Sequence, residues 1–366
     1  MPSITLALSA MATRFEIVLH GDRPTALRAA GEEALEEIER LEAQLSQFRS
    51  SSEIAHLNSR AAKEPVRVTP SLFALLQQAQ KLHRETGGAF DITIAPLVRC
   101  WGFRDGTGHF PNPEALAEAR KRVGMSLVHL EPKDFTVRFA REGVMLDLGA
   151  IGKGYAIERA AEILREAGVT SALLHGGTST VQAIGHPPDA DTWKVAVANP
   201  LPGAPASPPA TRVGSPSPWG EGRLVLRSAV DEGGGEGEFG GDSSPPLPPR
   251  STAAESATPS LLATVQLKDE AMSVSGIRGK FFQAEGRTFG HILDPRTGQA
   301  ATGVVLAVVI LPSATETDAL STALLISGTQ GHEKIASLRP GMRTLVAAEA
   351  DGVLQVETKG IPARRL

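Results

Sequence analysis

The 366-residue sequence contains a single cysteine, Cys100. One thiol can form no internal disulfide and cannot assemble a thiolate zinc site, so we expect Cys100 to be a small packed residue. Aromatic residues make up only 4% of the chain, and the net charge is −4. Without a basic excess or many aromatic rings, the sequence lacks the charge and the stacking surfaces typical of nucleic-acid-binding proteins. We therefore expect no nucleic acid partner.

Long apolar runs are also missing. No stretch reaches the roughly 20 residues that a membrane-spanning helix needs. Residues 1–8 alternate like a strand and lack the basic region and apolar run of a secretory signal. The sequence as written therefore predicts a cytoplasmic protein without a membrane span.

Hydrophobic periodicity predicts helices and strands in an irregular order. The expected helices are residues 25–45, 71–86, 113–123, 153–167 and 315–327. The expected strands are 4–8, 15–19, 134–140 and 143–148 (as a hairpin), 171–174, 193–198, 262–267, 271–275, 287–293, 303–311, 344–348 and 353–358. The sustained strand–helix–strand spacing of a doubly wound sheet is absent, so we predict an α+β fold.

Residues 201–260 differ from the rest of the chain in composition, because proline, glycine and serine dominate most of them. Such a segment buries too little apolar surface to offset the entropy of ordering it. We predict a disordered insertion in a surface loop, since loop closure costs grow only slowly with length. A proline-rich partner-binding motif is the alternative. The whole chain, 1–366, is then a single domain interrupted by this insertion.

Asp318 and Thr322 lie four residues apart in an expected helix, and therefore on one helical face. Ser313 or Thr315 can cap this helix. A carboxylate and a hydroxyl offer two oxygen ligands to a hard cation such as Mg²⁺, which takes carbonyl, water and phosphate oxygens as its other ligands. The alternative is a solvated helix face whose threonine bonds back to its own turn.

Three further segments carry polar residues that suit a ligand. Residues 146–155 place three glycines and Lys153 at a strand-to-helix junction, where a phosphate or a plain glycine turn would fit; the spacing is neither that of a P-loop nor that of a Rossmann fingerprint. Asp91 follows a Gly-Gly turn and can bind a ligand or hold its own loop as an Asx turn. His291 precedes a tight Asp-Pro-Arg-Thr-Gly turn and is a candidate ligand-facing residue.

Taken together and in this order, these segments resemble the ApbE family, the FAD:protein FMN transferases. The matching segments are 11–15, 45–54 with Asn58, 88–103, 147–155, 175–177, 273–276, 291–298 and 318–323. They extend over almost the entire chain apart from the insertion. The resemblance implies an ApbE-like fold in which helices pack on mixed or antiparallel sheets.

The family resemblance also implies a reaction and a site. The expected reaction is the Mg²⁺-dependent transfer of FMN from FAD to a threonine hydroxyl of a target flavoprotein, with release of AMP. The implied metal ligands are Asp318, Thr322 and the carbonyl of Ala150. The implied FAD contacts are Met11, Phe48, Ala89, Phe90, Asp91, Asp147, Lys153, His291 and Thr315. We expect Asp318, Lys153 and His291 to take part in catalysis.

Two features depart from the family pattern. Thr178 follows Gly176 and Gly177 where the family usually has aspartate, and the chain shows no lipobox although the family is commonly exported as a lipoprotein. Two other functions stay open. One is an FAD-binding protein or FAD pyrophosphatase that yields FMN and AMP without a protein acceptor. The other is a catalytically inactive interaction module, for which Thr178 and the proline-rich insertion argue.

Overall fold

The computed structural model describes residues 1–104, 108–200, 224–226, 261–277, 281–284, 287–350 and 353–362. Its helices are α1 (Pro24–Leu45), α2 (Glu53–Arg60), α3 (Pro70–Glu85), α4 (Ala95–Cys100), α5 (Pro113–Arg120), the 3₁₀ turn η1 (Met125–Leu127), α6 (Gly152–Glu166) and α7 (Ala314–Ala336). Its strands are β1 (Ser3–Ala10), β2 (Thr13–His20), β3 (Val66–Arg67), β4 (Val128–Glu131), β5 (Thr136–Phe139), β6 (Ala172–Gly176), β7 (Thr180–Ile184), β8 (Trp193–Ala198), β9 (Leu224–Leu226), β10 (Leu261–Leu267), β11 (Ala271–Gly276), β12 (Phe281–Ala284), β13 (Arg287–Gly290), β14 (Val304–Leu311), β15 (Arg343–Ala350) and β16 (Val353–Lys359).

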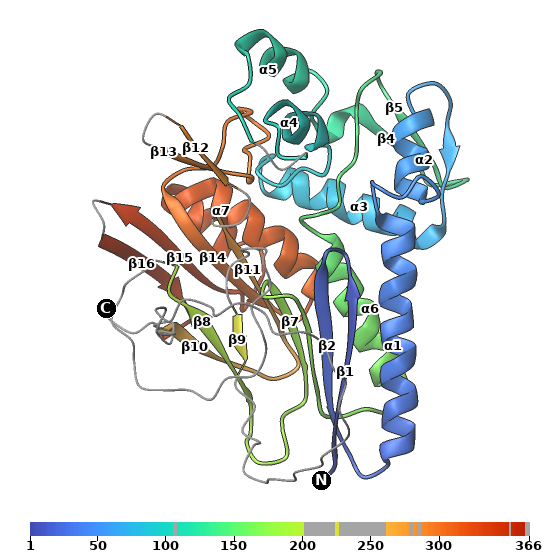
Figure 1. Cartoon of the computed structure of the whole chain (residues 1–366), viewed down its shortest axis with the longest axis vertical. Helices are drawn as coiled ribbons and strands as arrows, with labels where there is room; N and C mark the ends of the chain where they lie inside the picture. Colours follow the sequence, from blue (N-terminus) through green and yellow to red (C-terminus); the bar gives the residue numbers. More distant parts are fainter. Residues whose placement is uncertain are drawn as a thin grey trace, which may run out of the picture.

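The central element is an antiparallel sheet, to which the described residues contribute eight strands in the order β1-β2-β6-β7-β11-β14-β15-β16. Helices α1, α6 and α7 cover one face, and the small sheet β10-β8-β9 covers the other (Figure 1). Strand β14 lies between these layers, and every one of its residues is buried. Its continuous apolar sequence, rich in valine, is therefore explained by burial on both faces.

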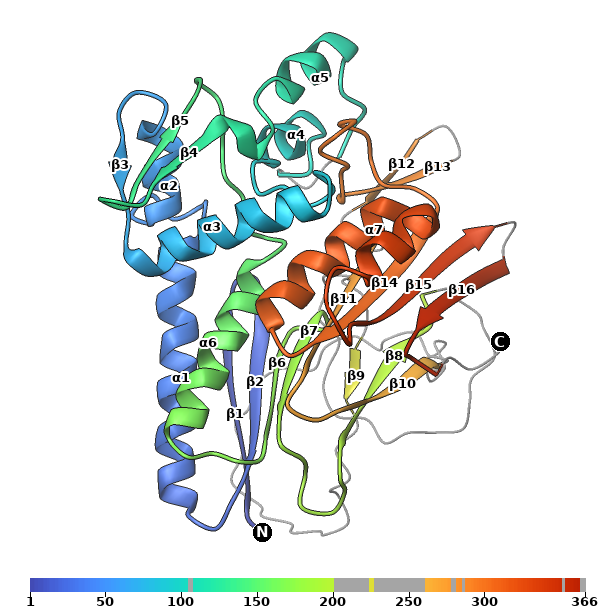
Figure 2. The same cartoon turned by 180° about the vertical axis from the view of Figure 1, so that it is seen from behind.

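A smaller part of the molecule lies beyond one end of the sheet and contains α3, α4, α5 and the short sheet β3-β5-β4 (Figure 2). There, the α4 region, α5 and the hairpin β12-β13 share an apolar cluster around Trp101, separate from those on the two faces of the main sheet. Cys100 is partly buried against this cluster, as expected for a packed thiol. Helices α3 and α6 and the turn between β1 and β2 approach one another at this end of the sheet (Figures 1 and 2).

The predicted α+β class is correct, and most of the predicted elements occur within a few residues of their expected bounds. The predicted hairpin of residues 134–140 and 143–148 is wrong. Strand β5 pairs instead with β3 and β4, and residues 143–148 form no strand. The side chain of Asn58 explains this, because it accepts from the N–H of Leu146 at 2.7 Å and donates to its carbonyl at 3.0 Å. A side chain therefore satisfies the backbone groups that a partner strand would have bonded.

Most of the predicted insertion, namely residues 201–223 and 227–260, lies outside the described residues. Within it, β9 pairs with β8, so part of the predicted insertion is ordered as a strand. The sequence patterns did not indicate α2, α4, β3, β4 or β7, which are short or irregular. Among the helices that the structure describes, none is long and apolar enough to cross a membrane.

Helix α7 is longer than the 315–327 helix that the sequence predicted. Gly328 interrupts it with φ 67° and ψ −171°, a conformation that is open almost only to glycine. The chain therefore changes direction within α7, and its second part does not continue along the axis of the first.

Candidate functional site

The first turns of α7 hold Asp318 against the start of α6. The carboxylate oxygen Oδ2 of Asp318 accepts a hydrogen bond from the backbone N–H of Gly154 at 2.9 Å. The hydroxyl of Thr180 lies 3.5 Å from Oδ1, and Asp318 as a whole is 5% exposed. A buried carboxylate needs such donors to offset the loss of its hydration. Asp318 is therefore held in one orientation by groups from two other elements.

Gly154 permits the close approach of α6 and α7. A Cβ at this position would lie 2.2 Å from the carbonyl oxygen of Ala314 and 2.6 Å from the Cβ of Asp318. No real side chain fits at such distances from backbone atoms. At Gly152, in contrast, the nearest atom would be the Cβ of Leu148 at 3.8 Å, an ordinary contact. Of these two glycines in the 146–155 segment, only Gly154 is required by packing.

Thr322 lies one turn after Asp318 and is partly buried. Its hydroxyl lies 3.2 Å from the Oγ of Ser275 on β11 and donates to the carbonyl of Asp318 at 3.4 Å. The second contact is the back-bonding that was left open as an alternative. The first contact, together with the burial of Asp318, shows that this face of α7 packs on the sheet. It is not a solvated helix face.

Buried hydroxyl groups connect this pair to strands β7 and β11. The Oγ of Ser273 lies 2.9 Å from the hydroxyl of Thr317 and 3.2 Å from that of Thr180. The Oγ of Ser275 lies 2.9 Å from that of Ser321. Sequence reasoning missed these roles, although Ser273 and Ser275 alternate with apolar residues and so share one face of a strand. That alternation was the available signal.

Asp147 organises the turn that leads into α6. Its Oδ1 accepts from the N–H of Gly149 at 2.8 Å, and its Oδ2 accepts from the side-chain amide of Gln47 at 2.6 Å. Its own N–H donates to the carbonyl of Ile92 at 2.7 Å. Asp147 therefore joins three segments: the end of α1, the loop that contains Asp91, and the start of α6.

Ala150 lies two residues before Gly152, the first residue of α6, and Lys153 directly follows Gly152; both are partly buried. The N–H of Gly152 donates to the carbonyl of Leu148 at 2.7 Å and that of Gly154 donates to Asp318, so the attraction of an anion to this end of α6 rests on the helix dipole. A lysine in the first turn adds positive charge at the same place. A phosphate at the start of α6 stays a prediction of the glycine-rich segment.

Asp91 holds its own loop after α3. Its Oδ1 accepts from the N–H of Thr93 at 2.8 Å and from the Thr93 hydroxyl at 2.5 Å. Its Oδ2 lies 3.1 Å from Nδ1 of His83, and its side chain is 1% exposed. The Asx-turn interpretation is therefore correct for the side chain. The neighbouring Ala89 and Phe90 are also buried, and the N–H of Phe90 donates to the hydroxyl of Thr86 at 3.2 Å.

His83 faces Asp91 and the carbonyl of Phe90, which lies 3.1 Å from its Nδ1. Burial by itself would lower the pKa of His83. The hydrogen bond and the charge of Asp91, with the Phe90 carbonyl, outweigh burial and raise that pKa above its ordinary value. His83 and Asp91 therefore form a pair that favours the protonated imidazole.

A cavity of about 580 Å³ borders this loop. It is lined by His83, Gly87, Gly88, Asp91, Ala117, Arg120, Lys121, Val123, Gly124, Pro295 and Arg296. Two of its cationic side chains already have partners, since Arg296 pairs with Asp294 and Lys121 pairs with Glu118. Arg120 also lines the cavity and donates to the carbonyl of Arg296 at 2.8 Å. The wall beside the Gly87–Gly88 turn is therefore basic, because His83, Arg120, Lys121 and Arg296 line it with one acidic residue, Asp91.

Met11 and Phe48 come from other elements. Met11 lies in the turn between β1 and β2 with φ 50°, and its N–H donates to the carboxylate of Glu42 at 3.0 Å. Phe48 follows α1 and is 69% exposed. The guanidinium of Arg104 lies 5.5 Å from the centre of its ring. An exposed ring with a cation at its face is free to stack on a planar aromatic ligand.

The remaining predicted residues lie in turns or at helix starts. Thr315 is 2% exposed, and its N–H donates to the carboxylate of Glu158 on α6 at 2.7 Å. His291 is partly buried immediately after β13, beyond the strand end rather than within the strand. Thr178 lies in the turn between β6 and β7. The contacts described above bring Asp318 to the start of α6, Thr315 to Glu158 in the next turn of α6, and Thr322 to Ser275 on β11. The ligand roles of all the predicted site residues stay predictions.

Among the described residues, no three or more His, Cys, Asp and Glu side chains gather as a metal-binding group. A metal at Asp318 would therefore depend on a mixed set of oxygen donors. Such a set is chemically suited to Mg²⁺ and unsuited to the softer metals that prefer thiolate or imidazole.

Known proteins match most of this chain, in sequence and in fold. The family model described as "ApbE family" matches residues 11–215 and 226–346. The FAD:protein FMN transferase of Treponema pallidum is 28% identical over 340 residues, which cover 91% of this chain and 81% of that protein. The ApbE protein of Thermotoga maritima superposes with a TM-score of 0.72 at 25% identity, over 98% of this chain and 97% of that one. The flavinyl transferase ApbE of Pseudomonas stutzeri shares the fold with a TM-score of 0.71 at 22% identity, over 98% and 95% of the two chains.

Proposed function

Because the chain belongs to the ApbE family, we propose that it transfers FMN from FAD to another protein. Curated relatives that carry the name FAD:protein FMN transferase support this activity. The observation in this chain that carries the proposal is the buried carboxylate of Asp318, held by the N–H of Gly154 at the start of α6. It combines a charged oxygen ligand with a helix N-terminus at one place, as a phosphoryl-transfer site requires.

The proposed reaction exchanges a phosphoanhydride bond of FAD for a phosphoester bond to the acceptor. The hydroxyl oxygen of an acceptor threonine bonds to the phosphorus on the FMN side of the FAD pyrophosphate. The bond from that phosphorus to the bridging oxygen breaks, and AMP leaves with this oxygen. The hydroxyl proton passes to a base. Phosphoryl transfer of this kind depends on positioning and on charge neutralisation more than on covalent chemistry.

Three oxygen donors of this chain fit Mg²⁺, namely the Asp318 carboxylate, the Thr322 hydroxyl and the Ala150 carbonyl. The fit rests on their hardness and on the orientation of Asp318, which Gly154 and Thr180 hold in place. When bound, Mg²⁺ would neutralise charge on the pyrophosphate. Thr322 is oriented by Ser275, so the hydroxyl network of β11 supports the same ligand set.

The other residues of the site have proposed roles as well. Asp318 or a neighbouring group accepts the proton of the acceptor threonine. Lys153 and the N-terminus of α6 attract the phosphates, and His291 takes part at the reacting phosphate. The exposed ring of Phe48 stacks on the isoalloxazine, which is the planar part of the substrate. Met11, Ala89, Phe90, Asp91, Asp147 and Thr315 complete the proposed FAD contacts.

The activity is tested by incubating the protein with FAD, MgCl₂ and an acceptor flavoprotein. Transfer predicts AMP release together with covalent flavin fluorescence on the acceptor, and no labelling when the target threonine is replaced by alanine. AMP release without a labelled acceptor would instead support the alternative function, hydrolysis of FAD to FMN and AMP. Absence of FAD binding would support the inactive interaction module.

The metal assignment is tested with three variants. We expect Asp318→Ala to slow transfer by roughly 100-fold, the size that loss of a charge-stabilising group commonly has. Thr322→Val removes a ligand oxygen and is expected to raise the Mg²⁺ concentration needed for half-maximal rate about tenfold, whereas Thr322→Ser keeps the oxygen and serves as the matched control. Full transfer by Asp318→Ala at ordinary Mg²⁺ would refute the assignment.

A further inference from the structure

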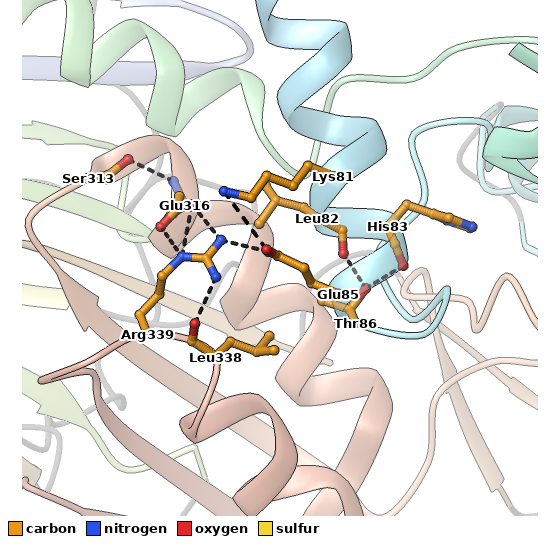
Figure 3. Close-up of polar contacts among 9 residues, drawn as sticks. All are labelled: Lys81, Leu82, His83, Glu85, Thr86, Ser313, Glu316, Leu338 and Arg339. Atoms are coloured by element: carbon orange, nitrogen blue, oxygen red, sulfur yellow. Dashed lines mark hydrogen bonds and ion pairs between the residues drawn. The ribbon is translucent and has the colours of Figure 1, made fainter. Parts of the chain in front are cut away.

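Arg339 lies between two carboxylates from different parts of the chain (Figure 3). Its Nε lies 2.9 and 3.1 Å from the two oxygens of Glu316, and its Nη2 donates to Glu316 at 2.8 Å. The same Nη2 donates to the carboxylate of Glu85 at 2.6 Å. Its Nη1 donates to the carbonyl of Leu338 at 2.8 Å. The guanidinium therefore bridges Glu316 and Glu85.

The break at Gly328 makes this contact possible. Arg339 follows Glu316 by 23 residues, which a straight helix would separate by roughly 34 Å at 1.5 Å per residue. Gly328 interrupts the helix in a conformation open almost only to glycine, so the second part of α7 folds back. The chain after α7 consequently returns to the first turn of the same helix.

The bridge is partly shielded from water. The side chains of Arg339, Glu316 and Glu85 are 18%, 18% and 25% exposed. The hydrogen bonds to Glu316 are the largest cause of a raised pKa of Arg339, to which Glu85 also contributes. Lys81 is more remote from Glu85, at 3.9 Å, and is 58% exposed. Loss of Arg339 would therefore leave two half-buried carboxylates close together without their main counter-charge.

Each carboxylate stands beside one half of the proposed site. Glu316 follows Thr315 and precedes Asp318 by two residues in the first turns of α7. Glu85 is the last residue of α3, directly before Thr86, whose hydroxyl accepts the N–H of Phe90. The bridge therefore joins the metal-ligand helix to the loop proposed to contact FAD.

We infer that Arg339 is a positioning residue that holds the loop of residues 86–91 at a set distance from Asp318, so that FAD and Mg²⁺ strengthen each other's binding. The inference rests on the proposed function. A planar guanidinium that bonds two carboxylates has a fixed geometry, so it can set the relative position of α3 and α7. Where one ligand strengthens the binding of another, the second strengthens the first by the same factor.

The test measures the dissociation constant of FAD with and without MgCl₂ in the full-length protein. We expect Mg²⁺ to tighten FAD binding roughly tenfold in the wild type and less than about twofold in Arg339→Met. Arg339→Lys is expected to fall between them, because lysine keeps the charge but loses the planar fork.

Arg343→Met is the matched control. Arg343 pairs with Glu270 at 2.6 Å, and these side chains are 24% and 30% exposed, so a similar ion pair is lost away from the two segments that Arg339 joins. We expect this variant to lose stability while it keeps the tenfold effect of Mg²⁺. If Arg339→Met and Arg343→Met lose the effect of Mg²⁺ on FAD binding equally, the inference is overturned, because the loss then follows from reduced stability alone.

Glu85→Gln keeps the inference testable if Arg339→Met does not fold. It weakens only the contact between Arg339 and α3 and leaves the Arg339–Glu316 contact in place. We expect it to reduce the effect of Mg²⁺ on FAD binding at least threefold. If Mg²⁺ tightens FAD binding as much in Glu85→Gln as in the wild-type protein, a positioning role is contradicted. It is also contradicted if the wild-type protein binds FAD equally with and without Mg²⁺. A wild type that binds no FAD would overturn the proposed function itself, and the inference with it.

Discussion

At the scale of single residues, three aspartates of the candidate site are oriented in the same way. Asp318, Asp147 and Asp91 each accept a hydrogen bond from a backbone N–H, at 2.9, 2.8 and 2.8 Å respectively. A backbone donor cannot rotate away, so it orients a carboxylate more firmly than a flexible side chain does. The acids of the site are therefore already oriented before a ligand arrives.

His83 supplies a prediction at this scale. Its pKa is raised in the folded protein, so its pairing with Asp91 stabilises the fold fully below its unfolded pKa of 6.5. That contribution is lost as the pH rises through the higher folded pKa. We expect His83→Gln to cost roughly 1–3 kcal/mol of unfolding free energy at about pH 5.5 and clearly less at about pH 9. Urea unfolding at the two pH values measures both costs.

The exposed histidine on β4, His129, is the control for this measurement. His129→Gln is expected to leave the unfolding free energy unchanged within about 0.5 kcal/mol at both pH values. If His83→Gln costs the same at both pH values, the charge on His83 does not contribute to stability.

At the scale of elements, the contact between α6 and α7 is the critical packing feature, because it places Asp318 at a helix N-terminus. We expect Gly154→Ala to cost roughly 1–3 kcal/mol of unfolding free energy or more, since its Cβ would overlap the carbonyl oxygen of Ala314. FMN transfer should fall as well, because the helices must separate. Urea unfolding and the transfer assay measure the two effects.

Gly152→Ala is the matched control in the same turn. Its Cβ would meet only the Cβ of Leu148, at 3.8 Å, and alanine favours the helix by up to about 1 kcal/mol. We therefore expect this variant to be as stable as the wild type or slightly more stable. Equal losses in the two alanine variants would contradict the packing explanation.

The elements also show where sequence patterns were sufficient. Long amphipathic segments such as α1 and α3 were predicted closely, because their periodicity is local and strong. Residues 143–148, most of which are apolar, were predicted as one strand of a hairpin. The bonds from Asn58, which is 88 residues away in the chain, decide their conformation instead. A local pattern cannot reveal such a distant partner.

At the scale of the whole molecule, the connection between β8 and β10 supplies another prediction. Leu261 pairs with Ala198, so the ends of these strands are neighbours that a short turn can join. We expect replacement of residues 200–260 by such a turn to keep FAD binding and transfer within roughly twofold, since the site residues lie on other elements. FAD titration and the transfer assay give the measurement.

The same replacement removes β9, which pairs with β8. A second variant that keeps residues 224–226 and shortens the chain on both sides separates the contribution of this strand. Loss of FAD binding in both variants would show that the segment serves the site and is not a passive insertion.

In the candidate site, some features follow from the local sequence and others from contacts between distant segments. The spacing of Asp318 and Thr322 places them on one helical face whatever the fold, because it follows from the helical repeat. Whether that face is buried depends on β7, β11 and α6, which the folded chain brings against it. The bridge of Arg339 to Glu85 joins residues 254 positions apart. Local spacing was enough to select the residues, whereas their burial and mutual support come from contacts between distant segments, which exist only once the chain has packed.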